Sequence, residues 1–345
     1  MQHNKKGTLK LEENFSLKAY NSFGIDTKAA YFGEVQTELD LQHSIAAGLF
    51  KNRFLILGGG TNMLFTQHFP GVVLHNNLKG ITVVSENDRF VLIRAAGGEL
   101  WHDLVEYCVN NNLGGIENLS LIPGTVGASP IQNIGAYGVE LKDVFYSLEA
   151  TDILTGEIKL FNFNDCKFAY RNSVFKNTLK GKFFINAVTF QLNKDPIINI
   201  TYGAIKDVLQ INGISSPGIK EVSDAVISIR KSKLPDPALL GNAGSFFKNP
   251  EIEINKYELL KLEFPGIPFF LVAPELVKVP AGWLIEQCGW KGKRVGNTGA
   301  HKDQALVLVN YGNATGEEIY ALALEIKRSV KNKFNIDIDP EVNII

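Results

Sequence analysis

LIPGTVGASPIQNIGAYG, residues 121–138, is the stretch that decides the fold of this chain. Its glycines are separated by small or hydroxylic residues, and the stretch carries no charged side chain. Glycine lets backbone N–H groups approach a ligand closely, because no Cβ stands in the way. Successive inward-turned amides bind anions, and Thr125 and Ser129 add hydroxyl donors. The stretch predicts a buried anionic ligand, with an ordinary structural loop as the alternative.

Two further glycine-rich turns extend this pattern. GGGTNMLF, residues 58–65, directly follows the apolar run 53–57 and adds donors for a phosphate or a ring. Neither this turn nor the first has the Lys-Ser/Thr pair of a Walker A loop or the G-x-G-x-x-G spacing of a dinucleotide fold. The third turn, GNAGSFFKNP at 241–250, presents Ser245 without the G-x-S-x-G elbow, so hydrolase chemistry is not favoured.

The composition excludes several classes of protein. A length of 345 residues predicts two or three domains, and 35 basic against 36 acidic residues leave no broad positive field for nucleic acid or an anionic membrane. We see no secretory signal and no apolar run of about 20 residues that would span a membrane. The cysteines, Cys108, Cys166 and Cys288, lack zinc-binding spacing, so no metal site is expected. Free thiols fit a reducing cytoplasm.

The order of the predicted elements favours an α+β fold, because several strands precede the first clear helix. Spacing of apolar residues places that helix at 99–112, before Gly114-Gly115. A later helix begins after Thr315, with Glu318 completing a capping box. Residues 195–237, with a helical stretch near 204–210 and a Gly/Ser/Pro loop at 213–218, are interpreted as a lid or a connector between domains. Strands are expected at 53–57, 72–75, 81–85, 90–95, in a hairpin over 148–161, at 183–192 and, as an edge strand, over 334–345.

Seven motifs, in order over nearly the whole chain, resemble the UDP-N-acetylenolpyruvoylglucosamine reductase family. They are Asn21-Ser22-Phe23-Gly24, GGGTNMLF, IPGTVGASPIQNIGAYG, YRNSVFK at 170–176, GNAGSFFKNP, PAGWLIEQCGWKG at 280–292 and terminal PEVNII. The motifs are long and specific. Tyr202-Gly203 resembles the form of the family that has a mobile substrate-covering loop.

The resemblance implies an α+β architecture with two functional parts and a monomeric state. Residues 15–195 would form an FAD-binding domain of the vanillyl-alcohol oxidase type, in two subdomains with a boundary near 75–80. Residues 196–237 would be the connector and mobile substrate loop. Residues 238–345 would form an α+β substrate-binding domain whose last strand returns to the active site.

The resemblance also implies a two-stage hydride relay. NADPH would reduce FAD, and the reduced flavin would reduce UDP-N-acetylglucosamine enolpyruvate at C3 to give UDP-N-acetylmuramate for peptidoglycan synthesis. Arg171 matches the arginine that stabilises the intermediate, Ser245 the serine that protonates C2, and Glu341 the glutamate that stabilises or protonates the enol. By residue type alone, Arg171 and Glu341 would be taken as ordinary solvated charges.

The remaining site residues follow from the same resemblance, and the preference for NADPH rests on it alone. Arg230, Lys233 and Lys248 would counter the substrate's anionic groups. FAD is expected to contact Gly58, Gly59, Gly60, Thr61, Asn62, Met63, Leu64, Ile122, Pro123, Gly124, Thr125, Gly127, Ala128, Ser129, Gln132, Asn133, Gly135, Ala136 and Arg230. The substrate is expected to contact Tyr137, Tyr202, Lys233, Lys248 and Asn249.

Two other functions are compatible with the glycine-rich turns. A flavin oxidase of the same fold often tethers its flavin to a His, Cys or Tyr, but His68, His75 and His102 read as scattered surface or core histidines. A non-catalytic protein that binds sugar nucleotides or has a regulatory role would keep the glycines but has no use for Arg171, Ser245 and Glu341 together.

Overall fold

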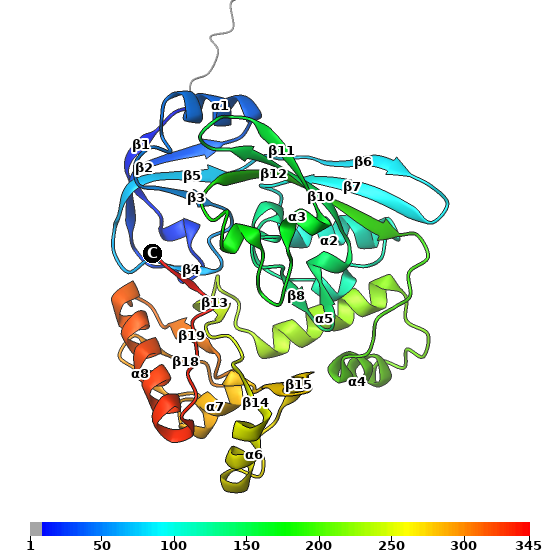
Figure 1. Ribbon diagram of the computed structural model, residues 1–345, viewed down its shortest axis with the longest axis vertical. Coiled ribbons are helices and arrows are strands. Elements are labelled where there is room, and N and C mark those ends of the chain that lie inside the picture. The colour runs from blue at the N-terminus through cyan, green and yellow to red at the C-terminus, as the bar shows by residue number, and fades with distance from the viewer. Residues whose placement is uncertain (1–8) are drawn as a thin grey trace, which may run out of the picture. The chain divides into compact units, whose positions relative to one another are not determined.

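The computed structural model describes residues 9–345 and groups them into two compact units (Figure 1). Unit 1 comprises residues up to Phe15, Ala29–Gly59 and Pro70–Arg230, and unit 2 comprises Ser16–Lys28, Gly60–Phe69 and Lys231–Ile345. Two N-terminal segments, Ser16–Lys28 and Gly60–Phe69, thus pack with the C-terminal part. Phe23 and Leu64, one from each segment, lie in the apolar core of unit 2.

Unit 1 contains two sheets. The first has the strand order β1-β2-β5-β3, with β3 parallel to β5, and the second is antiparallel with the order β11-β10-β12-β7-β6. The strands are β1 (Glu12–Ser16), β2 (Lys28–Val35), β3 (Phe54–Leu57), β5 (Phe69–Asn76), β6 (Ile81–Glu86), β7 (Phe90–Ala96), β10 (Phe145–Asp152), β11 (Ile158–Asn162) and β12 (Phe183–Asn193), with the short pair β8 (Gly135–Ala136) and β9 (Val139–Glu140). The helices are α1 (Glu38–Ala46), α2 (Trp101–Asn110), α3 (Phe163–Cys166), α4 (Gly203–Ile211) and α5 (Ile219–Lys233).

Helix α2 covers the second sheet, and its position was predicted from the spacing of its apolar residues. Trp101, Leu104 and Cys108 are fully buried, and the Trp101 ring packs edge-on against Phe190 of β12, with centroids 5.7 Å apart. Burial raises the pKa of the Cys108 thiol to about 12, as it does for Cys166. Both thiols are therefore protonated at neutral pH and act as small apolar side chains.

The expected connector at 195–237 is more ordered than its composition indicates. Helix α4 was predicted from sequence, but α5, whose buried residues include Val222, Val226 and Ile229, was not. The Gly/Ser/Pro loop at 213–218 that precedes α5 hid the helical periodicity that follows it.

Unit 2 combines two small antiparallel sheets with helices. The sheets have the strand orders β13-β19-β18-β17 and β14-β16-β15. The elements are β4 (Met63–Leu64), β13 (Gly241–Ser245), β14 (Glu251–Glu253), α6 (Ile254–Glu263), β15 (Phe270–Ala273), β16 (Leu276–Lys278), α7 (Ala281–Gln287), β17 (Arg294–Val295), β18 (Thr298–Ala300), β19 (Val307–Asn310), α8 (Gly316–Phe334) and β20 (Asn343–Ile344).

Helix α8 begins as predicted and ends later than predicted. Thr315 and Glu318 form the capping box, and Ile319, Ile326 and Val330 are buried against β18 and β19 (Figure 1). The helix continues to Phe334, where the sequence pattern predicted the start of a strand. That prediction was wrong for most of 334–345: only β20 is a strand, and it pairs in parallel with β4. Within residues 9–345, no helix is both long and apolar enough to span a membrane.

Candidate active site

The glycine-rich stretch 121–138 forms a loop of unit 1 that is held against the end of β7. The Gly127 N–H donates to Gly97 O at 2.8 Å, and the Val126 N–H donates to Glu99 O at 2.9 Å. A Cβ on Gly127 would lie 3.0 Å from the Cα of Gly97, and a Cβ on Gly97 would lie 2.4 Å from Ile185 O. The two backbones touch, so glycine is required at both positions.

The loop has the features expected of a phosphate cradle. Thr125 is 4 % exposed, and its Oγ1 has no hydrogen-bond partner among the described residues. An unsatisfied buried hydroxyl costs about 1–3 kcal/mol, so a ligand that binds it recovers that cost. A Cβ on Gly58 would lie 2.5 Å from this Oγ1. The hydroxyl of Ser129 is instead satisfied within the loop, donating to Val126 O at 2.6 Å. These residues fit the pyrophosphate of FAD.

The turn that carries Arg171 is tied to the same loop by side-chain hydrogen bonds. Asn133 Nδ2 donates to Ala169 O at 3.2 Å, and Ser173 Oγ donates to Ile131 O at 2.7 Å. The guanidinium of Arg171 donates to Gly135 O at 2.9 Å. The structure therefore brings Arg171 and the second half of the glycine-rich stretch together.

Arg171 sits in a strained conformation. Ala169 and Asn172 exchange backbone hydrogen bonds of 3.0 Å, which leaves Tyr170 and Arg171 at the tip of a tight turn. The φ of Arg171 is +50°, a left-handed conformation that costs a non-glycine residue about 1–2 kcal/mol. Such strain concentrates at functional sites. Other non-glycine residues of this region that share the conformation are Leu121, Asn133 and Tyr137.

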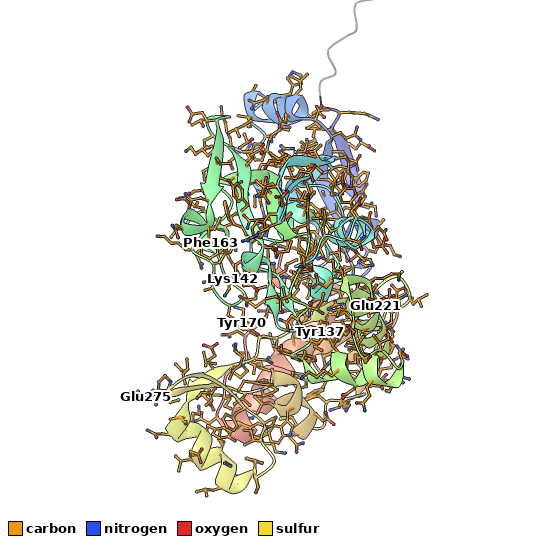
Figure 2. The ribbon with its side chains drawn as sticks, turned by 90° about the vertical axis from the view of Figure 1, so that its right-hand side faces the viewer. Tyr137, Lys142, Phe163, Tyr170, Glu221 and Glu275 are labelled. Atoms are coloured by element: carbon orange, nitrogen blue, oxygen red, sulfur yellow. The ribbon has the colours of Figure 1, made fainter. Side chains whose placement is uncertain are left out.

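Two tyrosines and a second arginine gather beside Arg171 in unit 1. The rings of Tyr137 and Tyr202 meet edge to face at 5.1 Å, and the Tyr137 hydroxyl shares a hydrogen bond with the Arg230 guanidinium. Arg230 Nε donates to Leu121 O at 3.1 Å. Burial lowers the pKa of Arg230, and the positive charge of Arg171 acts in the same direction. Two neighbouring guanidiniums favour an anionic ligand. Figure 2 labels Tyr137 and Tyr170.

Ser245 occupies the end of strand β13 in unit 2, on an irregular turn. Gly244 has a φ of +69°, and its N–H donates to Asn242 Oδ1 at 2.9 Å. The pairing of β13 with β19 shifts register between Asn242 and Ser245, which marks a bulge. Ser245 is exposed, whereas the following Phe246 is fully buried. The bulge thus presents the serine hydroxyl while the next side chain anchors the core.

Glu341 lies on the backbone segment beside Ser245. The Glu341 N–H donates to Phe246 O at 2.8 Å, and the Lys248 N–H donates to Asp339 O at 2.9 Å. Asn62, from the second glycine-rich turn, donates from Nδ2 to Glu341 O at 3.4 Å. Unit 2 therefore brings together Ser245, Glu341 and Asn62, which are far apart in the sequence.

The other predicted site residues have varied surroundings. Lys248 follows Ser245 on the segment that pairs with Asp339. Asn249 Oδ1 accepts a hydrogen bond of 2.9 Å from the N–H of Ala281, the first residue of α7, so it supports that helix. Lys233 is exposed at the end of α5.

We expect Gly60→Ala to destabilise unit 2 far more than Gly24→Ala. Both glycines have a left-handed backbone conformation, with φ of +62° and +64°. This conformation is unfavourable for alanine, so the substitution destabilises the fold at either position. A Cβ on Gly60 would lie 1.9 Å from the backbone oxygen of Tyr20, whereas nothing lies within 4 Å of a Cβ on Gly24. Urea unfolding should show a loss of about 2–4 kcal/mol for Gly60→Ala and about 1 kcal/mol for Gly24→Ala. Equal losses would contradict the contact.

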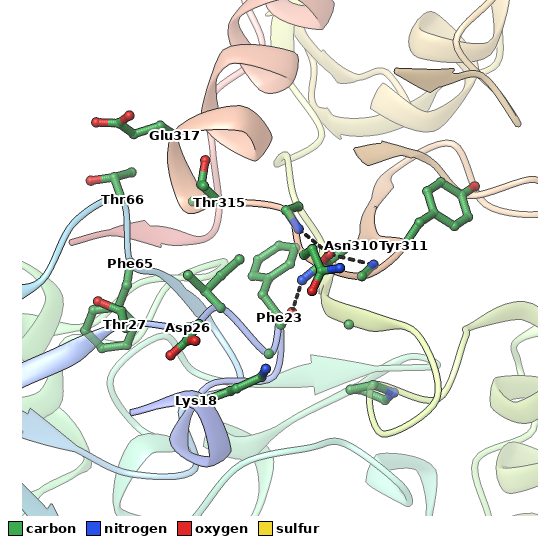
Figure 3. Close-up of a pocket in the computed structure, with 18 of the residues that line it drawn as sticks. Lys18, Phe23, Asp26, Thr27, Phe65, Thr66, Asn310, Tyr311, Thr315 and Glu317 are labelled. Atoms are coloured by element: carbon green, nitrogen blue, oxygen red, sulfur yellow. Dashed lines mark hydrogen bonds between the residues drawn. The ribbon is translucent and has the colours of Figure 1, made fainter. Parts of the chain in front are cut away.

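A separate cavity of about 810 Å³ opens in unit 2 (Figure 3). It is bordered by the loop from Phe23 to Thr27, by Phe65–His68 and by the segment Asn310–Glu317 that leads into α8. Asn310 closes its floor with hydrogen bonds to Phe23 O, Gly312 N and Ala314 N. None of the residues predicted for FAD or substrate lines this cavity.

Sequence reasoning missed two parts of the site region. Gly97 contacts the glycine-rich loop at Gly127, and the signal for it was a glycine pair at the end of a predicted strand. The motif at 21–24 was recognised only through the resemblance. In the structure its backbone joins Gly60 to Asn242: the Ser22 N–H donates to Gly60 O at 3.1 Å, and Ser22 O accepts from the Asn242 N–H at 2.9 Å.

Comparison with known proteins identifies the family of the chain. Residues 29–161 match the family model of an FAD binding domain, and residues 236–345 match that of the UDP-N-acetylenolpyruvoylglucosamine reductase C-terminal domain. A curated reductase of that name from Flavobacterium johnsoniae is 50% identical over 338 residues, which cover 98% of this chain and 100% of the relative. One from Amoebophilus asiaticus is 49% identical over 336 residues, covering 97% and 99%.

A solved structure shares the fold. The UDP-N-acetylenolpyruvylglucosamine reductase from Thermus caldophilus is similar with a TM-score of 0.68 at 21% identity, over 97% of this chain and 99% of that one. The expected α+β fold, with an FAD-binding domain and a C-terminal reductase domain, is confirmed. Full-length relatives at this level of identity leave one assignment: the chain belongs to the UDP-N-acetylenolpyruvoylglucosamine reductase family.

Proposed function

We propose that this chain reduces UDP-N-acetylglucosamine enolpyruvate to UDP-N-acetylmuramate in peptidoglycan precursor synthesis, with FAD as cofactor and NADPH as reductant. Family membership supports the overall reaction. The observation that carries the residue assignments is the pairing of the backbone at Phe246–Lys248 with that at Asp339–Glu341. It sets the proposed proton donor, Ser245, beside the proposed acid partner, Glu341.

The binding of FAD is proposed to rest on the glycine-rich turns and Arg230. When bound, FAD would supply the redox chemistry, the transfer of a hydride from NADPH to C3 of the enolpyruvyl group. The backbone amides around Gly124–Gly127 and the hydroxyl of Thr125 hold the pyrophosphate. The buried Thr125 Oγ1, which accepts or donates no hydrogen bond within residues 9–345, supports this assignment.

Arg171 is proposed to stabilise the charge that develops on the substrate. Adding hydride at C3 leaves negative charge at C2 that is shared with the adjacent carboxylate. A planar guanidinium pairs with both oxygens of such a group, which an ammonium does not. The anchored turn of Arg171 supports this role, because its hydrogen bond to Gly135 O limits where the guanidinium lies.

Ser245 is proposed to give its proton to C2, with Glu341 assisting beside it. A hydroxyl is a weak acid toward water, but a carbanion-like C2 is basic enough to take its proton. Exposure of Ser245 at a bulge leaves the hydroxyl accessible to a ligand.

The anionic parts of the substrate are proposed to bind the cationic and aromatic groups. Tyr137 and Tyr202 would cover the sugar nucleotide beside Arg230, and Lys233, Lys248 and Asn249 would contact its nucleotide part. The lowered pKa of Arg230 supports this: a bound phosphate offsets both the burial and the charge of Arg171.

The wider organisation is part of the same proposal. Residues 15–195 would bind FAD, 196–237 would provide the mobile substrate loop, and 238–345 would bind substrate. The enzyme would act as a monomer in the cytoplasm; the free thiols of Cys108 and Cys166 support the reducing compartment.

Steady-state kinetics test the proposed function. We expect NADPH oxidation to require the enolpyruvyl substrate and to give parallel double-reciprocal lines when both substrates are varied, because one pocket serves them in turn. Intersecting lines would argue for separate pockets. An unchanged rate of NADPH oxidation when the enolpyruvyl substrate is added would contradict the proposed reaction.

A further inference from the structure

The motif Asn21-Ser22-Phe23-Gly24 contains one polar group that the fold does not use. The Asn21 side chain closes the loop, donating to Leu17 O at 2.8 Å and Ile25 O at 3.0 Å and accepting from the Ile25 N–H at 2.9 Å. Phe23 is 1 % exposed and packs on Phe246 in the core of unit 2. Gly24 takes the left-handed turn. Only the Ser22 hydroxyl has no structural role.

Ser22 Oγ is buried, and no residue within 9–345 forms a hydrogen bond with it. Burying a hydroxyl without a hydrogen-bond partner lowers the stability of the fold by about 1–3 kcal/mol. Alanine would fill nearly the same space without that loss. An apolar side chain would therefore suit the fold of the free protein better. A bound ligand that forms a hydrogen bond with the Ser22 hydroxyl would explain why a serine stands at this position.

The neighbours of Ser22 identify that partner. Its N–H donates to Gly60 O, and the loop packs so closely on Gly60 that a Cβ there would strike the Tyr20 oxygen. On the other side stands Asn242, which is 2 % exposed. The amide of Asn242 is already used, donating to Pro235 O and Leu240 O and accepting from the Gly244 N–H. The Asn242 side chain is thus engaged with other groups, and the turn that begins at Gly60 is the other segment bonded to the backbone of Ser22.

The separate cavity of unit 2 does not account for the hydroxyl. Phe23 and Gly24 line that cavity and Ser22 does not (Figure 3). A ligand of that cavity would therefore meet the next residues of the loop and leave Ser22 Oγ unsatisfied.

We infer that the Ser22 hydroxyl is a direct hydrogen-bonding partner of FAD at the turn Gly60–Leu64. The inference rests on the proposed function, because that turn is a proposed flavin contact. Ser22 is bonded through its N–H to Gly60 O at 3.1 Å, so its position is set by the same turn that would receive the cofactor. The hydroxyl can donate to a carbonyl or phosphate oxygen or to a ring nitrogen.

The test compares Ser22→Ala, Ser22→Thr and Ser16→Ala as full-length holoenzymes. Each is diluted in steps, and released FAD is measured by its fluorescence. Ser22→Ala should weaken FAD binding about tenfold, equivalent to about 1.4 kcal/mol. Ser22→Thr keeps the hydroxyl and should recover most of the affinity. Ser16→Ala changes an exposed serine of the same unit and should match the wild type.

Thermal unfolding separates flavin contact from a structural role. By linkage, FAD stabilises the fold according to the ratio of free FAD to Kd, so a variant that only binds FAD more weakly regains the wild-type midpoint when FAD is raised in proportion to its higher Kd. Unchanged FAD release from Ser22→Ala, or a midpoint that stays lowered when FAD is raised in proportion to the Kd of the variant, would overturn the inference. So would a raised KM for the enolpyruvyl substrate with normal FAD affinity. A third outcome separates the two proposals. If the wild type binds FAD and Ser22→Ala weakens that binding, but NADPH oxidation does not depend on the enolpyruvyl substrate, the proposed function is refuted and the inference about Ser22 stands.

Discussion

Ser245→Ala should still be reduced by NADPH at nearly the wild-type rate, but its flavin should reoxidise about 100- to 10,000-fold more slowly on the enolpyruvyl substrate. The loss is confined to the second half-reaction, because the hydroxyl is proposed to supply a proton only to C2. Stopped-flow absorbance of the flavin follows the two half-reactions separately. Normal reoxidation would remove Ser245 from the mechanism.

Ser245→Cys is the matched variant. A thiol is close in size to a hydroxyl and is a stronger acid, so it should restore part of the reoxidation rate that alanine loses. The bulge at Gly244 and the burial of Phe246 do not involve the Ser245 side chain, so neither variant should disturb the fold. Equal defects in the two variants would indicate that the serine acts by position and gives no proton.

Arg171→Lys should slow the substrate half-reaction about 100-fold or more, since one preorganised charge-stabilising group is worth that much in comparable sites. Lysine keeps the positive charge, but its ammonium group cannot pair with two carboxylate oxygens at once as the planar guanidinium of arginine does. It should tolerate the left-handed turn no worse than arginine, because neither is β-branched. The reduction of flavin by NADPH should change only a few-fold, as measured by the same stopped-flow method.

Arg94→Lys is the control for that experiment. Arg94 makes a two-pronged ion pair, with Nε and a terminal nitrogen each 2.7 Å from Glu149, so its guanidinium is already paired with a carboxylate between strands β7 and β10. Its replacement should leave both half-reactions at wild-type rates. A similar loss in both variants would mean that Arg171 matters for stability rather than for the developing charge.

Much of the fold could be predicted because its signals are local. The apolar spacing of Leu104, Val105 and Cys108 marks α2, and Thr315 with Glu318 marks the start of α8, since both depend on residues within one or two turns. The glycines at 124 and 127 likewise indicated close backbone approach before any neighbour was known. The names of the site residues came from long motifs that are contiguous in the sequence.

Elements without a local signal could not be predicted. Helix α5 follows a breaker-rich loop, and the short strand β20 exists only because β4 lies beside it. A two-residue strand has too few positions to show alternation. The prediction of a strand over 334–345 was wrong at its start because the apolar face of α8 continues to Phe334.

By itself, the sequence determined which turns need glycine, where the main helices begin and which residues belong to the family's motifs. Only the tertiary structure decided which of those motifs meet within each unit. It set Ser245 beside Glu341, tied the turn of Arg171 to Gly135, and placed Ser22 against Gly60 with an unused hydroxyl. The physical reason is that hydrogen bonds between distant segments depend on the path that the apolar cores impose on the chain, and no short window of sequence records that path.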